Sequence, residues 1–215
     1  MQKEICLYYQ PVYSREVMES AFLCEEHDLS GIGVTPDMLT KVKSIISKER
    51  RLSCCIDFPG GLSFCDVKIH SIISCIRRGA NCIDFVVNPS HIANSSDLSK
   101  MQEEVSSAYS LCQERNVVFR PMIDYRSYRN EKILKIFNTL KNIGVDFCFI
   151  STGMLSDDIT DHSAISRYVS DFCQINVIYN GKLWSNEQYQ KILETGIYGV
   201  AFKSLISYKS TFGVL

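Results

Sequence analysis

The chain has 215 residues, of which 46% are hydrophobic and 22% are charged, and its formal net charge is -1. This composition is typical of a globular protein with a substantial core, and the length suits one large α/β domain or two small ones. A net charge so close to zero gives no long-range attraction to nucleic acid or to an anionic membrane, and no apolar run approaches the roughly 18 residues of a spanning helix. We therefore expect neither nucleic acid nor a membrane as a partner.

Ten cysteines are spread along the chain without the spacing of a metal site. Cys54 and Cys55 are adjacent, and the others form no CxxC pair and no cluster with histidine. Most lie in apolar patterns, where a free thiol behaves as a small hydrophobic side chain. The start of the chain lacks a charged-then-apolar leader, so we expect no secretion signal. We expect the thiols to be free and the protein to be cytoplasmic.

Short apolar runs rich in Ile, Val, Cys and Phe alternate with segments of helical period along the whole chain. The runs lack polar alternation, which favours parallel strands covered on both faces. No linker or low-complexity stretch divides the sequence, and no glycine fingerprint follows the first run. We therefore predict a single-domain (β/α)8 barrel, the TIM-barrel class, over residues 1–215. The predicted strands are 5–9, 31–34, 53–58, 82–88, 117–123, 147–150, 175–179 and 198–202, and the seven helices between them are 14–27, 36–48, 66–78, 97–115, 130–143, 161–172 and 186–194.

Two of these helices carry clear start signals. Thr35 precedes Pro36, which places a capping residue before a proline at the first helical position. Ser185 precedes Asn186 and Glu187, which suits an N-cap followed by an acidic first turn. We therefore expect helices to begin at both points.

Several motifs, in the right order and spacing, resemble the deoxyribose-phosphate aldolase family over nearly the whole chain. The segments are 30–36 (SGIGVTP, similar to A-x-V-C-V-x-P), 55–61 (CIDFPGG, similar to V-I-G-F-P-x-G), 78–88 (RGANCIDFVVN, similar to N-G-A-D-E-I-D-M-V-I-N) and 145–153 (VDFCFISTG, similar to A-D-F-x-K-T-S-T-G). The resemblance implies a class I aldolase barrel that cleaves a phosphorylated deoxy sugar through a lysine Schiff base. It implies no cofactor.

The resemblance also implies site residues, and only part of that set is kept. The family's strand-four aspartate matches Asp84, and its strand-five lysine corresponds to Arg120. Its strand-six nucleophilic lysine corresponds to Phe149, and its strand-seven lysine to Ile178. Neither Phe nor Ile offers an amine, and a guanidinium stays protonated and non-nucleophilic. General acid–base help alone contributes about 10²–10⁴-fold, so we expect Schiff-base cleavage to be lost.

The phosphate end of the implied site is better kept. In the family, the turns after strands six, seven and eight cradle the sugar phosphate, and here these turns contain two glycines, two lysines and two serines. Glycine lets the backbone approach an anion closely, and lysine adds positive charge. The expected phosphate-binding residues are Gly153, Gly181, Lys182, Lys203 and Ser204.

Alternatives remain open at this point. Asp84 and Arg120 form either a working acid–base pair or a buried ion pair inherited from ancestral chemistry. Asp57, Asp84 and Asp124 end successive strands, but no histidine accompanies them, so we expect no metal site.

Three functions follow from these residues. The first is a divergent aldolase-like pseudoenzyme that binds a phosphorylated small molecule. The second is a carbon–carbon lyase whose amine has moved to Lys182 or Lys203. The third is a non-enzymatic interaction or regulatory protein. A homodimer is a further expectation, by analogy with other barrels alone.

Overall fold

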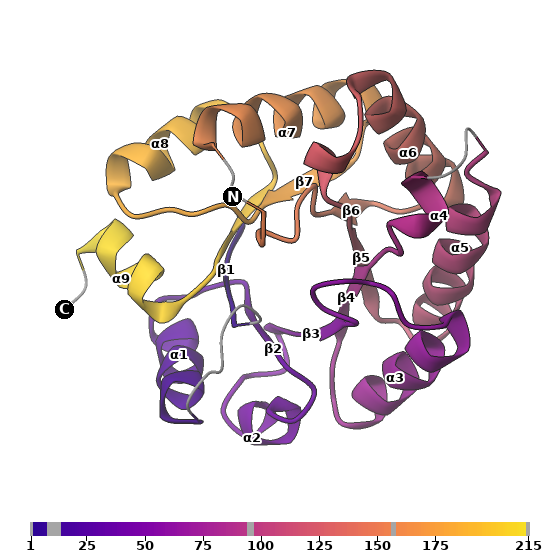
Figure 1. Ribbon diagram of the computed structural model, residues 1–215. Helices are drawn as coiled ribbons and strands as arrows, with labels where there is room; N and C mark the ends of the chain where they lie inside the picture. The colour runs from indigo at the N-terminus through magenta and orange to yellow at the C-terminus, as the bar shows by residue number, and fades with distance from the viewer. Residues whose placement is uncertain (1, 8–13, 94–96, 156–157, 214–215) are drawn as a thin grey trace.

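The computed structural model describes residues 2–7, 14–93, 97–155 and 158–213, which form an inner ring of parallel strands with helices outside it (Figure 1). Neighbouring strands follow the order β5-β4-β3-β2-β1-β8-β7-β6. Phe149 closes the ring, because its amide donates to the Pro121 carbonyl at 2.9 Å and its carbonyl accepts from the Ile123 amide at 3.1 Å. The predicted (β/α)8 barrel is confirmed. The strands are β1 (Gln2–Cys6), β2 (Gly31–Val34), β3 (Arg51–Ile56), β4 (Cys82–Val86), β5 (Val118–Met122), β6 (Phe147–Cys148), β7 (Asn176–Tyr179) and β8 (Gly199–Phe202).

The outer layer contains the seven predicted helices and, among the described residues, two further α-helices and a short 3-10 turn at Tyr125–Ser127. No helix in the described ranges is both long enough and apolar enough to cross a bilayer. The α-helices are α1 (Ser14–Glu26), α2 (Leu39–Lys43), α3 (Cys65–Arg77), α4 (Ser90–Ala93), α5 (Ser99–Glu114), α6 (Asn130–Ile143), α7 (Ile159–Cys173), α8 (Asn186–Glu194) and α9 (Leu205–Phe212).

The two predicted helix starts had different outcomes. The Ser185 side chain accepts a hydrogen bond from the Gln188 amide at 3.2 Å, so the predicted cap of α8 is confirmed. The start predicted at Thr35 is wrong, because the hydroxyl of Thr35 donates to the carboxylate of Asp37 at 2.6 Å and the chain first makes a turn. The helix α2 begins only at Leu39.

The first strand begins earlier than the apolar pattern predicted. The structure places β1 at Gln2–Cys6, whereas the prediction began at residue 5 and extended to residues 8 and 9, which lie outside the described part of the chain. The side chains of the two polar residues Lys3 and Glu4 lie on opposite faces of β1. Glu4 is fully buried in the barrel, and the Lys3 ammonium lies 5.0 Å from the centre of the Phe212 ring outside it.

Two separate apolar cores stabilise this architecture. The larger one fills the space between the strands and the surrounding helices. The smaller one lies inside the barrel and takes a single buried side chain from each of seven strands or strand ends. We call this smaller set the inner plug, and it consists of Cys6, Cys55, Val86, Met122, Phe149, Ile178 and Ala201.

Candidate functional site

The inner plug brings together the two residues that the resemblance aligns with the family's lysines. Phe149 continues β6, and Ile178 lies on β7, whose neighbours in the ring are β6 and β8. Their side chains are 1% and 0% exposed, and both pack against the other members of the plug. The centre of the barrel at this level is therefore filled with apolar atoms.

Directly beside the plug lies a buried ion cluster centred on Arg120. Its guanidinium binds Asp84 through two contacts, Nε to Oδ1 at 2.5 Å and Nη2 to Oδ2 at 2.9 Å. It also donates to Glu4 Oε1 at 2.6 Å and to Ser53 Oγ at 2.8 Å. Arg51 binds the same Glu4 oxygen at 2.9 Å, and its side chain, unlike that of Glu4, is partly exposed. The predicted Asp84 and Arg120 are thus brought together, within a larger set.

The buried charges change the pKa of Arg120 and of two neighbouring thiols. Burial alone would lower the pKa of the Arg120 guanidinium, but the carboxylates of Asp84 and Glu4 outweigh it and raise the pKa well above its ordinary value. Burial raises the pKa of the Cys6 thiol, and the charges of Glu4 and Asp84 raise it further. Burial, with Asp84, does the same to the pKa of Cys55. The thiols at the barrel centre are therefore neutral and poor nucleophiles.

Contact between the plug and the cluster is direct. The guanidinium carbon of Arg120 lies 4.9 Å from the centre of the Phe149 ring, within the range of a cation–π interaction. A cation that is surrounded by two carboxylates, a hydroxyl and an aromatic ring has its donors engaged by the protein itself. The protein therefore holds the guanidinium of Arg120 from several sides.

At the carboxyl end of the barrel, Asp124 organises the turn after β6. Its carboxylate accepts from the Ser151 hydroxyl at 3.0 Å, the Thr152 amide at 2.8 Å and the Thr152 hydroxyl at 2.7 Å. The Ser151 hydroxyl also accepts from the amide of Gly153 at 2.8 Å. Because these donors and acceptors satisfy one another, the turn has a defined shape.

Lys203 joins the turn after β6 to the end of β8. Its ammonium donates to the carbonyl of Gly153 at 2.6 Å. Gly153 has a φ of 73°, a conformation that favours glycine, and a Cβ there would displace the Lys203 ammonium from its position. The side chain of Asn180 ties in the turn after β7 by donating to the Ser151 carbonyl at 2.6 Å. Three predicted loops therefore meet at one place.

The remaining predicted phosphate residues lie around this meeting point in different roles. Ser204 caps α9, because its side chain accepts from the Ser207 amide at 3.0 Å. Gly181 is buried, and a Cβ there would collide with the Tyr179 hydroxyl. Lys182 is exposed. The structure brings Gly153 and Lys203 into contact and leaves Lys182 on the surface.

Sequence reasoning missed one buried cation. Lys68 of α3 is 1% exposed, and its ammonium donates to the carbonyls of Gly61 and Val86 at 2.7 and 2.9 Å and to Glu104 at 2.7 Å. The ammonium also lies 3.5 Å from the Asp57 carboxylate. The sequence signal that could have revealed this burial is the position of Lys68 on the apolar side of the helical pattern of α3. Its contacts show a role in holding the loop after β3 against α5.

Among the described residues, no three His, Cys, Asp or Glu side chains gather closely enough to hold a metal ion. Asp57 and Asp124 follow the ends of β3 and β5, whereas Asp84 lies within β4. Their carboxylates have separate protein partners at Lys68, Thr152 and Arg120.

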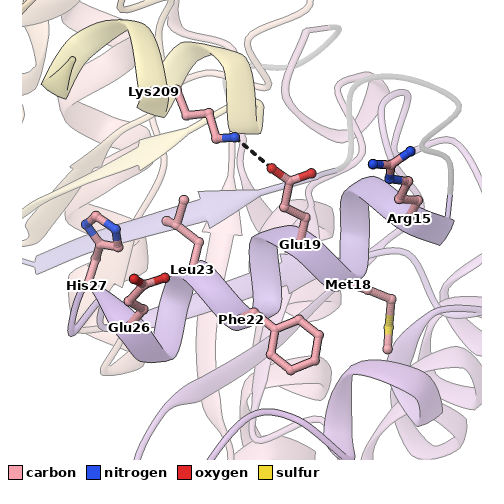
Figure 2. Close-up of a pocket in the computed structure, with 8 residues that line it drawn as sticks. All are labelled: Arg15, Met18, Glu19, Phe22, Leu23, Glu26, His27 and Lys209. Atoms are coloured by element: carbon pink, nitrogen blue, oxygen red, sulfur yellow. Dashed lines mark hydrogen bonds and ion pairs between the residues drawn. The ribbon is translucent and has the colours of Figure 1, made fainter. Parts of the chain in front are cut away.

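A surface groove of about 580 Å³ lies between α1 and α9, away from these residues (Figure 2). Two of the charged residues that line the groove pair with each other, because the ammonium of Lys209 binds the carboxylate of Glu19 at 2.6 Å. None of the predicted site residues lines this groove. We assign the candidate site to the barrel and its carboxyl-end loops.

Comparison with known proteins gives a consistent result. No family model matches the chain. A deoxyribose-phosphate aldolase of Treponema denticola is 26% identical over 140 residues, which cover 65% of this chain and 64% of that enzyme, just under two thirds of its length.

Two solved structures share the fold. QR15, an aldolase, has a TM-score of 0.78 at 22% identity over 96% of this chain and 91% of its own. The tetrameric deoxyribose-phosphate aldolase of Aeropyrum pernix has a TM-score of 0.86 at 15% identity, over 97% of this chain and 87% of its own. The chain is therefore a (β/α)8 barrel that is similar in part of its sequence to a deoxyribose-phosphate aldolase.

Proposed function

We propose that the chain is a divergent aldolase-like pseudoenzyme, which does not cleave 2-deoxyribose 5-phosphate through a Schiff base and binds a phosphorylated small molecule at the barrel mouth. The observation that carries the first part is the inner plug. Phe149 and Ile178 occupy the positions that the resemblance assigns to lysines, and both side chains are buried in the apolar plug and offer no amine to a substrate carbonyl.

The residual polar pair supports the same proposal. A general acid or base must exchange a proton with the substrate, and therefore needs an oxygen or nitrogen within hydrogen-bonding reach of it. Both oxygens of Asp84 contact the guanidinium of Arg120 instead. We propose that Asp84 and Arg120 are structural, since a buried ion pair is strongly destabilised when either partner is lost.

Positive charge at the mouth supports the second part. Lys203 lies beside the positive-φ Gly153, and the N-terminus of α9, which follows Ser204, adds the partial positive charge of a helix end. Lys182 and Gly181 lie on the adjoining turn after β7. In the proposed complex the Lys203 ammonium turns from the Gly153 carbonyl toward the phosphate.

Borohydride trapping tests the chemistry. The protein is incubated with acetaldehyde or 2-deoxyribose 5-phosphate, reduced, and digested for peptide mass mapping. We expect no lysine adduct. An adduct on Lys203 or Lys182 would instead establish the lyase alternative, in which the amine has moved to a neighbouring loop.

That alternative has one observation in its favour. The Lys203 amine is only partly exposed and stands at the carboxyl end of β8, where barrel enzymes place their chemistry. Its position next to the Gly153 carbonyl, outside the inner plug, makes it the described lysine best placed for a carbonyl substrate.

A thermal-shift titration tests the anion site. Inorganic phosphate and 2-deoxyribose 5-phosphate are expected to stabilise the protein, by about 2.7 kcal/mol at a hundredfold excess over the dissociation constant. Lys203→Gln should abolish the shift. Lys191→Gln is the matched control, since Lys191 is an exposed lysine on α8 paired with Glu187 at 3.0 Å, and it should titrate as the unmodified protein does. Equal shifts in both variants would contradict the assignment.

If neither a lysine adduct nor a phosphate-dependent thermal shift is found, the third function remains, that of an interaction or regulatory protein. Exposed apolar side chains on the loops after β3, β6 and β7 support it, among them Phe64, Met154 and Trp184. We propose a homodimer as the simplest assembly, to be tested by light scattering. We also propose a cytoplasmic location, because ten free cysteines suit a reducing compartment.

A further inference from the structure

Two free cysteines lie in contact beneath the outer helical layer. Cys54 is in β3 and Cys75 is in α3, and the Cys54 thiol donates to the Cys75 sulfur at an Sγ–Sγ distance of 3.3 Å. Both side chains are buried in the core between strands and helices. A disulfide needs an Sγ–Sγ distance of about 2.05 Å, so the sulfurs need to approach by only about 1.2 Å.

One of the two cysteines, Cys75, is among the residues that line a surface pocket. The pocket has a volume of about 320 Å³, large enough for several water molecules or a small oxidant. Cys54 is not among its lining residues and lies behind Cys75. The lining residues are Pro36, Asp37, Ser71, Ser74, Cys75 and Arg78.

The electrostatic environment gives the two thiols different roles. The hydrogen bond from Cys54 lowers the pKa of Cys75; burial opposes this, and the guanidinium of Arg78 lowers the pKa further. The same hydrogen bond raises the pKa of Cys54, and burial adds to that increase. Cys75 is therefore the thiol of the pair that more readily forms a thiolate, the nucleophilic form of cysteine. Arg78 is itself exposed and is held over the end of α3 by a hydrogen bond to the Ser74 carbonyl at 3.0 Å.

We propose that Cys54 and Cys75 form a dithiol site that a small hydroperoxide oxidises to a disulfide through the pocket beside Arg78. In the first step the Cys75 thiolate attacks the distal peroxide oxygen. The O–O bond breaks, Cys75 becomes a sulfenic acid, and the alkoxide or hydroxide leaves and takes up a proton. In the second step the Cys54 sulfur attacks the Cys75 sulfur, the S–O bond breaks, and the Cys54 proton leaves with the hydroxyl as water. A thiol reductant restores the pair.

Other cysteines provide the contrast. Cys65 is the one thiol of the ten that is only partly buried, but burial raises its pKa and its strongest neighbouring charge is the carboxylate of Glu104. Exposure alone would make Cys65 the preferred target of an oxidant. The proposed site predicts the opposite order, because reactivity follows thiolate character and a neighbouring resolving thiol.

The test treats the folded, reduced protein with one equivalent of hydrogen peroxide. We expect an intact mass lower by two hydrogen atoms, a single crosslinked peptide pair containing Cys54 and Cys75, and full reversal by dithiothreitol. Cys54→Ala lacks the resolving thiol and the hydrogen bond that lowers the pKa of Cys75, so it should form a sulfenic acid on Cys75 more slowly, and dimedone should capture it. Cys75→Ala should form neither the disulfide nor a dimedone adduct at Cys54, and Cys65→Ala should react as the unmodified protein does.

A charge variant keeps the test informative if a core cysteine variant fails to fold. Arg78→Gln should slow disulfide formation, because the thiolate fraction falls by up to about tenfold for each unit by which the pKa of Cys75 rises and the higher nucleophilicity offsets only part of this, while Arg78→Lys should retain most of the rate. Disulfides that map to other pairs, faster oxidation at Cys65, or an unchanged rate in Arg78→Gln would overturn the proposal.

Discussion

The buried ion cluster makes a strong prediction about stability. Arg120→Met removes the cation that lies between Asp84 and Glu4 and replaces it with an apolar side chain of comparable length. The two carboxylates are both fully buried, so water cannot take over the role of the guanidinium. Glu4 keeps its 2.9 Å contact with Arg51, whereas Asp84 loses two contacts with the guanidinium, at 2.5 and 2.9 Å.

The expected loss is about 3–5 kcal/mol, the cost of breaking a buried ion pair by removing one partner. For a chain of this length, each kcal/mol lowers the melting temperature by about 2–4 °C, which gives a drop of about 6–20 °C. A buried carboxylate that has lost its cation is relieved by taking up a proton. The difference between variant and unmodified protein should therefore be larger at pH 7 than at pH 5.

Calorimetric melts at the two pH values provide the measurement. The matched control is Arg167→Met, which breaks an exposed pair with Asp171 at 3.4 Å and should cost less than about 1 kcal/mol. The triple variant Glu4→Gln, Asp84→Asn, Arg120→Met should recover most of the loss, because no uncompensated charge remains. If Arg120→Met melts as Arg167→Met does at pH 7, the cluster does not stabilise the barrel in the way argued.

Three further predictions concern single contacts. Lys68→Met should cost about 3–5 kcal/mol in urea unfolding, because it leaves Glu104 as a buried carboxylate without its lysine; a loss below about 1 kcal/mol would contradict the role assigned to Lys68. Asp124→Asn should cost about 1–3 kcal/mol and increase amide exchange at Thr152, since one carboxylate oxygen that accepts from this turn becomes a donor; unchanged exchange would count against it. Hydrogen bonds from the Thr160 and Asp161 amides lower the pKa of Asp158, so its stabilising effect is present above the unfolded value of about 3.9 and is lost as the pH falls through the lower folded value. Asp158→Ala should therefore lower the melting temperature at pH 6 and have little effect near pH 2.

The number and order of the strands could be predicted from sequence because barrel strands are buried on both faces and read as continuous apolar runs. The pairing of Asp84 with Arg120 could also be predicted from the sequence. These residues lie on neighbouring strands at the same level, and the structure places them directly opposite each other in the ladder. A local pattern and a regular register were sufficient in both cases.

The part that Glu4 takes in the buried ion cluster could not be predicted in this way. A glutamate in a polar stretch at the start of a chain is usually exposed, and its burial depends on Arg120, which is 116 residues away. The mouth shows the same limit. The sequence indicated three turns with glycine and lysine, but the contact between Lys203 and Gly153 joins residues 50 positions apart and depends on how the loops pack.

The barrel interior is best understood as a single charge-balanced unit. Glu4 and Asp84 supply two negative charges, Arg120 and Arg51 supply two positive charges, and the Phe149 ring covers the guanidinium of Arg120 at 4.9 Å. The substitution Phe149→Lys would place a third cation beside Arg120, whose two carboxylate partners are already balanced, and like charges at this distance in a buried site disfavour each other strongly. Arg120 is therefore compatible with the phenylalanine at this position in a way that it is not with a lysine. A return to amine chemistry would require replacement of Arg120 as well as Phe149, which is why we regard the plug and the ion cluster as one interdependent feature of this protein.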